Sequence, residues 1–142
     1  MSAQDNSRLT MYIDGASRGN PGPAAVGVVL LDAVGSHVLS ISSYIGETTN
    51  NQAEYRALIT GLTEAAKLNT GHLDIRSDSE LLVRQITGRY RVRNADLMPL
   101  FRQAKGLLGS FGSYSIDHIP RKQNSAADAL ANQALDAQLR GR

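Results

Sequence analysis

The feature that most limits the fold is a set of three strand-like segments near the start of the chain, joined by short turns. Residues 9–14 alternate apolar and polar side chains, which is the pattern of a half-buried strand. Residues 25–31 and 38–44 are rich in apolar and β-branched side chains, and the turn-forming segment GASRGNPGP lies between the first two. Strands connected this closely predict an antiparallel meander.

The remainder of the chain alternates helical and strand periodicity. A meander followed by such alternation predicts an α/β fold, a mixed sheet with helices packed on it. Pro99 is compatible with a helix because proline is tolerated in a first turn. The pattern predicts helices over residues 51–68, 79–87, 95–108 and 125–139, and strands over 72–76 and 113–118.

Length and composition fit one domain that can bury a normal core. The chain has 142 residues, of which 42% are hydrophobic and 20% charged, and both fractions are ordinary for globular proteins. It has no cysteine, which excludes disulfides and thiolate metal sites and suits the cytoplasm. It shows neither a signal pattern nor a membrane-length apolar run. We expect a single domain over residues 8–139, a disordered tail over 1–7, a short C-terminal tail over 140–142, and a monomer without membrane contact.

Charge alone leaves the binding partner open. The formal net charge is only +2, although six basic residues fall between positions 84 and 105. Such a cluster fits either a solvated helix face or a surface that contacts a polyanion.

Four acidic residues lie either on a face that is expected to be buried or near the end of a strand or helix. Glu54 shares the apolar stripe of the helix over 51–68 with Leu58 and Leu62, although burying an unpaired carboxylate is unfavourable. Asp14 ends the first strand on its polar face, and Asp78 follows the fourth strand. Asp128 lies in the first turn of the last helix.

A divalent cation would make this placement of carboxylates tolerable. Mg²⁺ prefers oxygen ligands, and two such ions about 4 Å apart suit an in-line phosphodiester displacement. Each acid also has a simpler interpretation. Asp14 could only form a turn, Glu54 and Asp128 could favour helix starts through the dipole, and Asp78 could assist a cap.

Four segments resemble, in order, the motif blocks of type 1 ribonuclease H: YIDGASRGNPGPAAVGVVL, TTNNQAEYRAL, IRSDSELLVRQI and HIPRKQNSAADALANQA. Together they span nearly the whole chain, from about residue 9 to about residue 135. The resemblance implies a five-stranded mixed sheet in the order 3-2-1-4-5 with helices on both faces. It also implies endonucleolytic cleavage of the RNA strand of RNA/DNA hybrids, leaving 5′-phosphate and 3′-hydroxyl ends. The implied ligands of two Mg²⁺ ions, for which Mn²⁺ could substitute, are Asp14, Glu54, Asp78 and the more mobile Asp128.

The same resemblance implies contacts with the substrate. A DNA-strand phosphate would be held by Asn20 and Thr48, while Asn50 and Gln52 would reach the minor groove. This fits the wide minor groove and 2′-hydroxyls of a hybrid, which neutral amides and hydroxyls can read. Asn50 or Asn51 could equally serve only as a helix cap. The full set of implied substrate residues is Gly15, Asn20, Thr48, Asn50, Gln52 and Glu80.

The chain departs from the family pattern in two places. Many members carry a long basic protrusion, whereas here only GRYRVRNAD links residues 87 and 97, so Arg89, Arg91 and Arg93 are expected to replace some phosphate contacts. The family's loop helper is usually a histidine. Here we favour Arg121 over His118, which falls within a strand pattern.

Two other functions remain open at the level of sequence. Another nuclease of the same superfold, such as an integrase-like strand transferase, would share the first acidic residue but not the DGASRGNPG block. A module that binds hybrids or double-stranded RNA without catalysis would gain nothing from concentrated negative charge. Whether double-stranded RNA is also cut, and whether the chain belongs to a longer fused protein, is not decided by sequence.

Overall fold

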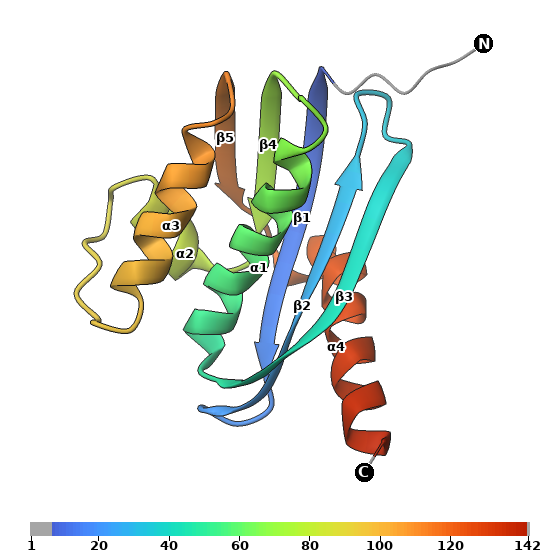
Figure 1. The fold of residues 1–142 in the computed structure, drawn as a ribbon, viewed down its shortest axis with the longest axis vertical. Helices are drawn as coiled ribbons and strands as arrows, with labels where there is room; N and C mark the ends of the chain where they lie inside the picture. Colours follow the sequence, from blue (N-terminus) through green and yellow to red (C-terminus); the bar gives the residue numbers. More distant parts are fainter. Residues whose placement is uncertain (1–6, 142) are drawn as a thin grey trace.

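The computed structural model describes residues 7–141. Their strands form one five-stranded sheet in the order β3-β2-β1-β4-β5 (Figure 1). Strands β1, β2 and β3 pair antiparallel, as predicted for the meander, whereas β4 is parallel to β1 and β5 is parallel to β4. The strands are β1 (Arg8–Ser17), β2 (Gly22–Leu31), β3 (His37–Thr48), β4 (His72–Ser77) and β5 (Ser113–His118).

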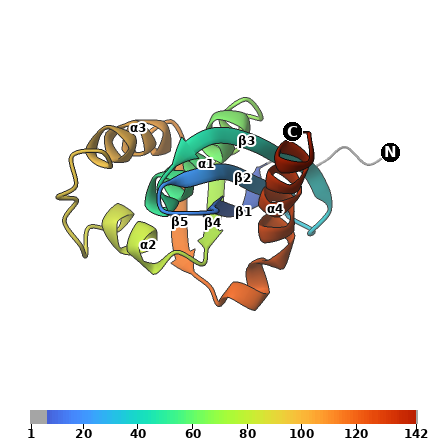
Figure 2. The ribbon, with the colours of Figure 1, turned by 90° about the horizontal axis from the view of Figure 1, so that it is seen from below.

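Helices cover both faces of this sheet, so the predicted mixed fold and strand order are confirmed. Figure 2 shows α1 and α4 on opposite sides of the strands, with α3 on the side of α1. A short 3₁₀ turn, η1 (Arg121–Asn124), leads from β5 into α4. The helices are α1 (Asn50–Ala66), α2 (Glu80–Ile86), α3 (Met98–Leu108) and α4 (Ser125–Arg140).

The core follows the alternation of β1. Leu9, Met11 and Ile13 are all fully buried on the face that packs against α1, and a Cβ at Gly61 of α1 would lie 2.5 Å from the Met11 Sδ. On the other face, Gly27 of β2 lies directly under α4. A Cβ at position 27 would come within 2.0 Å of the Ala127 carbonyl oxygen. A glycine therefore allows each helix to lie close to the sheet: Gly61 on α1 itself, and Gly27 on the strand beneath α4.

Several boundaries differ from those predicted. Asp14 does not end β1, because the hairpin ladder continues through the pair Ser17 and Ala24. Thr49, rather than Asn50 or Asn51, caps α1, and its side chain accepts the backbone N–H of Gln52 at 3.2 Å.

Helix α3 begins at Met98 rather than at position 95. The Asn94 side chain accepts the backbone N–H groups of Asp96 and Leu97 at 2.7 and 3.2 Å, and this turn delays the helix. Pro99 lies in the first turn of α3, as predicted. Helix α4 continues to Arg140.

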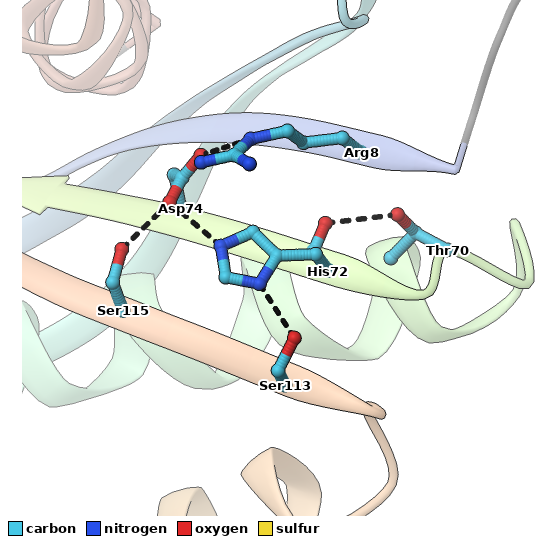
Figure 3. Close-up of polar contacts among 6 residues, drawn as sticks. All are labelled: Arg8, Thr70, His72, Asp74, Ser113 and Ser115. Atoms are coloured by element: carbon cyan, nitrogen blue, oxygen red, sulfur yellow. Dashed lines mark hydrogen bonds and ion pairs between the residues drawn. The ribbon is translucent and has the colours of Figure 1, made fainter.

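A polar network joins the starts of β1, β4 and β5 (Figure 3). Asp74 accepts hydrogen bonds from Arg8 Nε at 2.9 Å and from Ser115 Oγ at 2.7 Å. His72 contacts Asp74 through Nε2 at 2.8 Å and Ser113 Oγ through Nδ1 at 2.6 Å. This network ties the three strands together. It lies at the opposite end of the parallel strands from Asp14 and Asp78.

The predicted N-terminal tail lies outside the described residues except for Ser7, and residue 142 of the C-terminal tail also lies outside them. The Ser7 carbonyl accepts the backbone N–H groups of Gly71 and His72 at 3.1 and 3.0 Å. Over residues 7–141, no helix combines the length and apolar character needed to cross a membrane.

Candidate active site

The parallel register of β1 and β4 brings two acidic residues together. Ile13 of β1 pairs with Ser77 of β4 at the end of their ladder, so Asp14 and Asp78 each follow a paired residue. Glu54, from the start of α1, joins them. One carboxylate oxygen from each of the three lies within 4.8 Å of the others. The structure thus brings together three of the four acids that the sequence singled out.

Glu54 is held at this position by the backbone of β1. The Glu54 side chain is buried, and its Oε1 accepts the Gly15 N–H at 2.8 Å. A Cβ at Gly15 would lie 2.2 Å from the carbonyl carbon and oxygen of Ala53. The absence of a side chain at position 15 therefore lets the start of α1 rest on the strand.

Asp128 borders the same cavity from the opposite face of the sheet. It lies in the first turn of α4, and its Oδ1 is 3.9 Å from Nη2 of the exposed Arg121. The cavity has a volume of about 200 Å³, and its lining consists of Asp14, Gly15, Ala16, Asn50, Glu54, Asp78, Arg121 and Asp128. All five residues that the sequence assigned to catalysis lie on this lining.

Burial and mutual repulsion oppose ionisation of the acidic cluster. Burial first, and then the charges of Asp78 and Asp128, raise the pKa of Asp14 from 3.8 to about 8. Burial and then Asp14 raise the pKa of Glu54 well above its ordinary value. Burial likewise raises the pKa of Asp78, against the opposing effect of Asn124 and Arg121.

These donors fit a hard divalent cation. Every side chain of the three-residue cluster offers carboxylate oxygen, which is the ligand type that Mg²⁺ prefers. A cation would also oppose the burial and repulsion that raise the three pKa values, because an opposite charge nearby favours the ionised carboxylate.

Asn124 contacts the acidic cluster although the sequence analysis did not single it out as a site residue. It is 1% exposed, and its Nδ2 donates to the Ile13 carbonyl at 2.8 Å. A hydrogen bond from its side chain lowers the pKa of Asp78 against the larger effect of burial. Asn124 therefore connects β1 and the end of β4 to the start of α4. The available signal was its position four residues before Asp128, one helical turn away.

Most of the predicted substrate residues gather at the start of α1. Asn20 Oδ1 accepts the Asn50 N–H at 3.0 Å, and the side chains of Thr48 and Gln52 are hydrogen-bonded to each other. A second cavity of about 220 Å³ opens there, and its lining includes Asn20 and Gln52 together with Asn94 of the loop before α3.

Glu80 and His118 lie apart from this group. Glu80 is paired with Arg84 Nη2 at 3.0 Å, and both line a third cavity of about 480 Å³ between α2 and β5, together with His118 and Arg89. His118 lies at the end of β5, as its strand pattern predicted, and is exposed there. Neither Glu80 nor His118 borders the cavity that holds the four acids.

Comparison with known proteins agrees with this architecture. A family model described as "Reverse transcriptase-like" matches residues 12–134. The crystal structure of RNase H1 from Halobacterium salinarum NRC-1 superposes with a TM-score of 0.89 at 48% identity, covering 92% of this chain and 98% of the other. LC11-RNase H1 in complex with an RNA/DNA hybrid gives a TM-score of 0.88 at 40% identity, covering 92% and 99%.

The sequences give the same result. The Ribonuclease HI of Halobacterium salinarum is 49% identical over 91% of this chain and 65% of its own length. A bifunctional protein of Mycobacterium tuberculosis is 45% identical over 92% of this chain but only 36% of its own length. The chain therefore spans under two thirds of each of these two relatives. The fold and the acidic cluster beside β1 and β4 define the ribonuclease H-like class. Within that class, the chain belongs to the type 1 ribonuclease H family.

Proposed function

We propose that the chain is an endoribonuclease that hydrolyses the RNA strand of RNA/DNA hybrids and leaves 5′-phosphate and 3′-hydroxyl ends. The observation that carries this proposal is the convergence of Asp14, Glu54 and Asp78, with one oxygen of each within 4.8 Å of the others. The structure of a relative with an RNA/DNA hybrid supports the choice of substrate. A binding module would have no use for repelling carboxylates that face phosphates.

The carboxylates would hold two Mg²⁺ ions, or Mn²⁺ in their place, with Asp128 as the fourth ligand. When bound, such ions activate water for attack and stabilise the leaving oxygen of an in-line displacement. Gly15 fixes Glu54 through its backbone N–H. The exposed Arg121 is permanently charged, so it would attract the phosphate product or assist its release rather than act as a base.

Hybrid recognition would begin at the start of α1. Asn20 and Thr48 would hold a DNA-strand phosphate, Asn50 and Gln52 would reach the minor groove, and Glu80 would lie near the 2′-hydroxyls. The exposed Arg89, Arg91 and Arg93 would replace part of the phosphate contacts that a basic protrusion makes in other members of the family. We further propose a monomer that acts in the cytoplasm, with double-stranded RNA as a second candidate substrate.

Cleavage of matched end-labelled substrates tests this function. The hybrid, an RNA duplex and a DNA duplex of one sequence would be incubated with Mg²⁺ or Mn²⁺, and the product ends mapped. We expect cuts only in the RNA strand of the hybrid, or in both RNA-containing substrates if double-stranded RNA is accepted. Intact hybrid binding without cleavage in either metal would instead favour the binding module.

The role of Arg121 has its own test. Arg121→Ala should lower the turnover of the hybrid, because the variant lacks the charge at the edge of the cavity, whereas His118→Ala should change it less. Steady-state kinetics of both variants compare the two residues. Full turnover in Arg121→Ala would show that the assignment of Arg121 is wrong.

A further inference from the structure

The turn between β1 and β2 reaches across to α4 through Arg18. Its Nη2 donates to Asn132 Oδ1 at 3.2 Å and to Asp136 Oδ1 at 2.7 Å. Asn132 in turn donates through Nδ2 to the Asp128 backbone carbonyl at 3.0 Å and to Asp128 Oδ1 at 3.3 Å. A continuous chain of hydrogen bonds therefore runs from the turn to the half-buried carboxylate of Asp128.

The orientation of the Asn132 amide is set from both sides, by Arg18 at its oxygen and by the two acceptor atoms of Asp128 at its nitrogen. A guanidinium can only donate hydrogen bonds, so it selects the amide oxygen and leaves Nδ2 directed at Asp128. Without Arg18, the amide oxygen would lose its donor, and only the two Asp128 acceptors would hold Nδ2 in place. The contacts from Asn132 at 3.3 Å and from Arg121 at 3.9 Å both reach Asp128 Oδ1, and together they orient this carboxylate at the cavity.

The same turn contacts the other helix that supplies an acid. Asn20, two residues after Arg18, accepts the N–H of Asn50 at the start of α1. The turn thus connects α4, which carries Asp128, to α1, which carries Glu54. We propose that Arg18 and Asn132 are positioning residues that hold Asp128 for metal binding and couple it to the turn that contacts the DNA strand. This inference rests on the proposed function.

Metal binding by the hybrid-free protein tests the inference directly. Asn132→Asp keeps the shape of the side chain but replaces the donor with a negative charge beside Asp128. We expect its Mg²⁺ affinity, measured by calorimetry, to fall about tenfold, as is common when a partner of a metal ligand is lost. Arg18→Leu should produce a smaller loss, and Arg18→Lys, which keeps a donor, should restore the affinity.

Activity should follow in a defined way. The Mg²⁺ concentration for half-maximal cleavage should rise by the same factor in Asn132→Asp, while the KM for hybrid at saturating Mg²⁺ stays within about twofold. Gln133→Ala, an exposed change on the same turn of α4, is the matched control and should leave the Mg²⁺ affinity unchanged. In an Asp128→Asn background, Asn132→Asp should have no further effect on Mg²⁺ affinity.

Each outcome decides the question. An unchanged Mg²⁺ affinity in Asn132→Asp, or a further loss in the Asp128→Asn background, would overturn the inference. If circular dichroism shows that Asn132→Asp does not fold, the comparison of Arg18→Leu with Arg18→Lys decides instead. A wild-type protein that binds Mg²⁺ but does not cleave hybrid would contradict the proposed function alone, because calorimetry still measures the coupling.

Discussion

Asp14 is the residue at which the competing demands of folding and chemistry are largest. Its side chain is 5% exposed, and burial together with Asp78 and Asp128 raises its pKa to about 8. The metal-free fold therefore carries a carboxyl group whose ionisation it opposes.

We expect Asp14→Asn to abolish hybrid cleavage and to stabilise the metal-free protein. The amide keeps the shape but removes one of several crowded negative charges. At pH 8 the midpoint of thermal unfolding in EDTA should rise by about 3–6 °C, or about 1 kcal/mol for a chain of this size. A large loss of stability would argue against a cluster that is built to hold a cation.

Gly15 sets the distance between β1 and α1, so its substitution should be severe. Gly15→Ala would place a methyl group 2.2 Å from the Ala53 carbonyl and displace Glu54 from the Gly15 N–H. We expect a loss of about 3 kcal/mol in urea-induced unfolding, at the upper end for overpacking, together with much weaker cleavage.

An alanine elsewhere provides the control for Gly15→Ala. Gly106 lies in α3, and a Cβ there would meet no atom within 4 Å. Gly106→Ala should therefore stabilise the protein by about 0.5–1 kcal/mol through helix propensity. Equal effects of the two substitutions would show that contact with Ala53 is not the cause.

At the scale of elements, α1 and α2 are joined by a buried hydrogen bond. The Tyr55 hydroxyl donates to Gln85 Oε1 at 2.6 Å, and both side chains are buried. Tyr55 follows Glu54, and α2 starts two residues after Asp78, so this bond braces the two elements next to the acidic cluster.

Tyr55→Phe should destabilise the protein by about 1–2 kcal/mol, because it leaves the Gln85 oxygen buried without its donor. Urea unfolding of the single variant and of Tyr55→Phe with Gln85→Leu would measure the cost. The double variant should recover part of the loss, since replacing both partners removes the unsatisfied group. Equal stability of wild type and Tyr55→Phe would mean that the bond contributes nothing.

Local patterns predicted the elements well because apolar periodicity determines which residues are buried. The stripe of Glu54, Leu58 and Leu62 is buried as expected, and the order of the strands followed from the family resemblance. The end of β1 was wrong because pairing continues past Asp14 into turn-like sequence, and no local signal marks where a hairpin ladder stops.

The contacts around the acids were not predictable in the same way. The bonds from Arg18 to Asn132 and from Asn124 to Ile13 join residues that are 114 and 111 positions apart. Such pairs depend on how α4 lies on the sheet, and no periodicity records this. The acids themselves could be identified because a charge on a buried stripe is visible in the sequence alone.

For the whole molecule, the acidic cluster and Asp74 make the stability of the fold depend on pH in opposite directions. The pKa of Asp14 is raised, so its contribution to stability is complete below about 3.8 and is lost as the pH rises towards 8. Burial opposes ionisation of Asp74, but hydrogen bonds from Ser115, His72 and Arg8 outweigh it and lower its pKa. The contribution of Asp74 is therefore present above pH 3.8 and is lost at lower pH.

The metal-free protein should accordingly be most stable at mildly acidic pH, about 4–5, and less stable at pH 8. Saturating Mg²⁺ should restore much of the loss at pH 8, because a ligand that binds only the folded state stabilises it. Thermal melts in EDTA and in Mg²⁺ across pH 3–9 would measure both effects. Asp14→Asn should flatten the EDTA curve, and identical wild-type melting temperatures at pH 5 and 8 in EDTA would contradict the raised pKa values.

The register between β1 and β4 has a consequence for how such a chain can change over time. Asp14 and Asp78 directly follow the paired residues Ile13 and Ser77. Successive side chains of a strand point to opposite faces, so a shift of one residue would move an acid to the other face of the sheet. Inserting one residue into β1 before Asp14 would turn Asp14 towards α1 and bring Ile13 to the position that borders the cavity. Length variation should therefore be tolerated in the loops and excluded from the two parallel strands, even where individual substitutions are accepted.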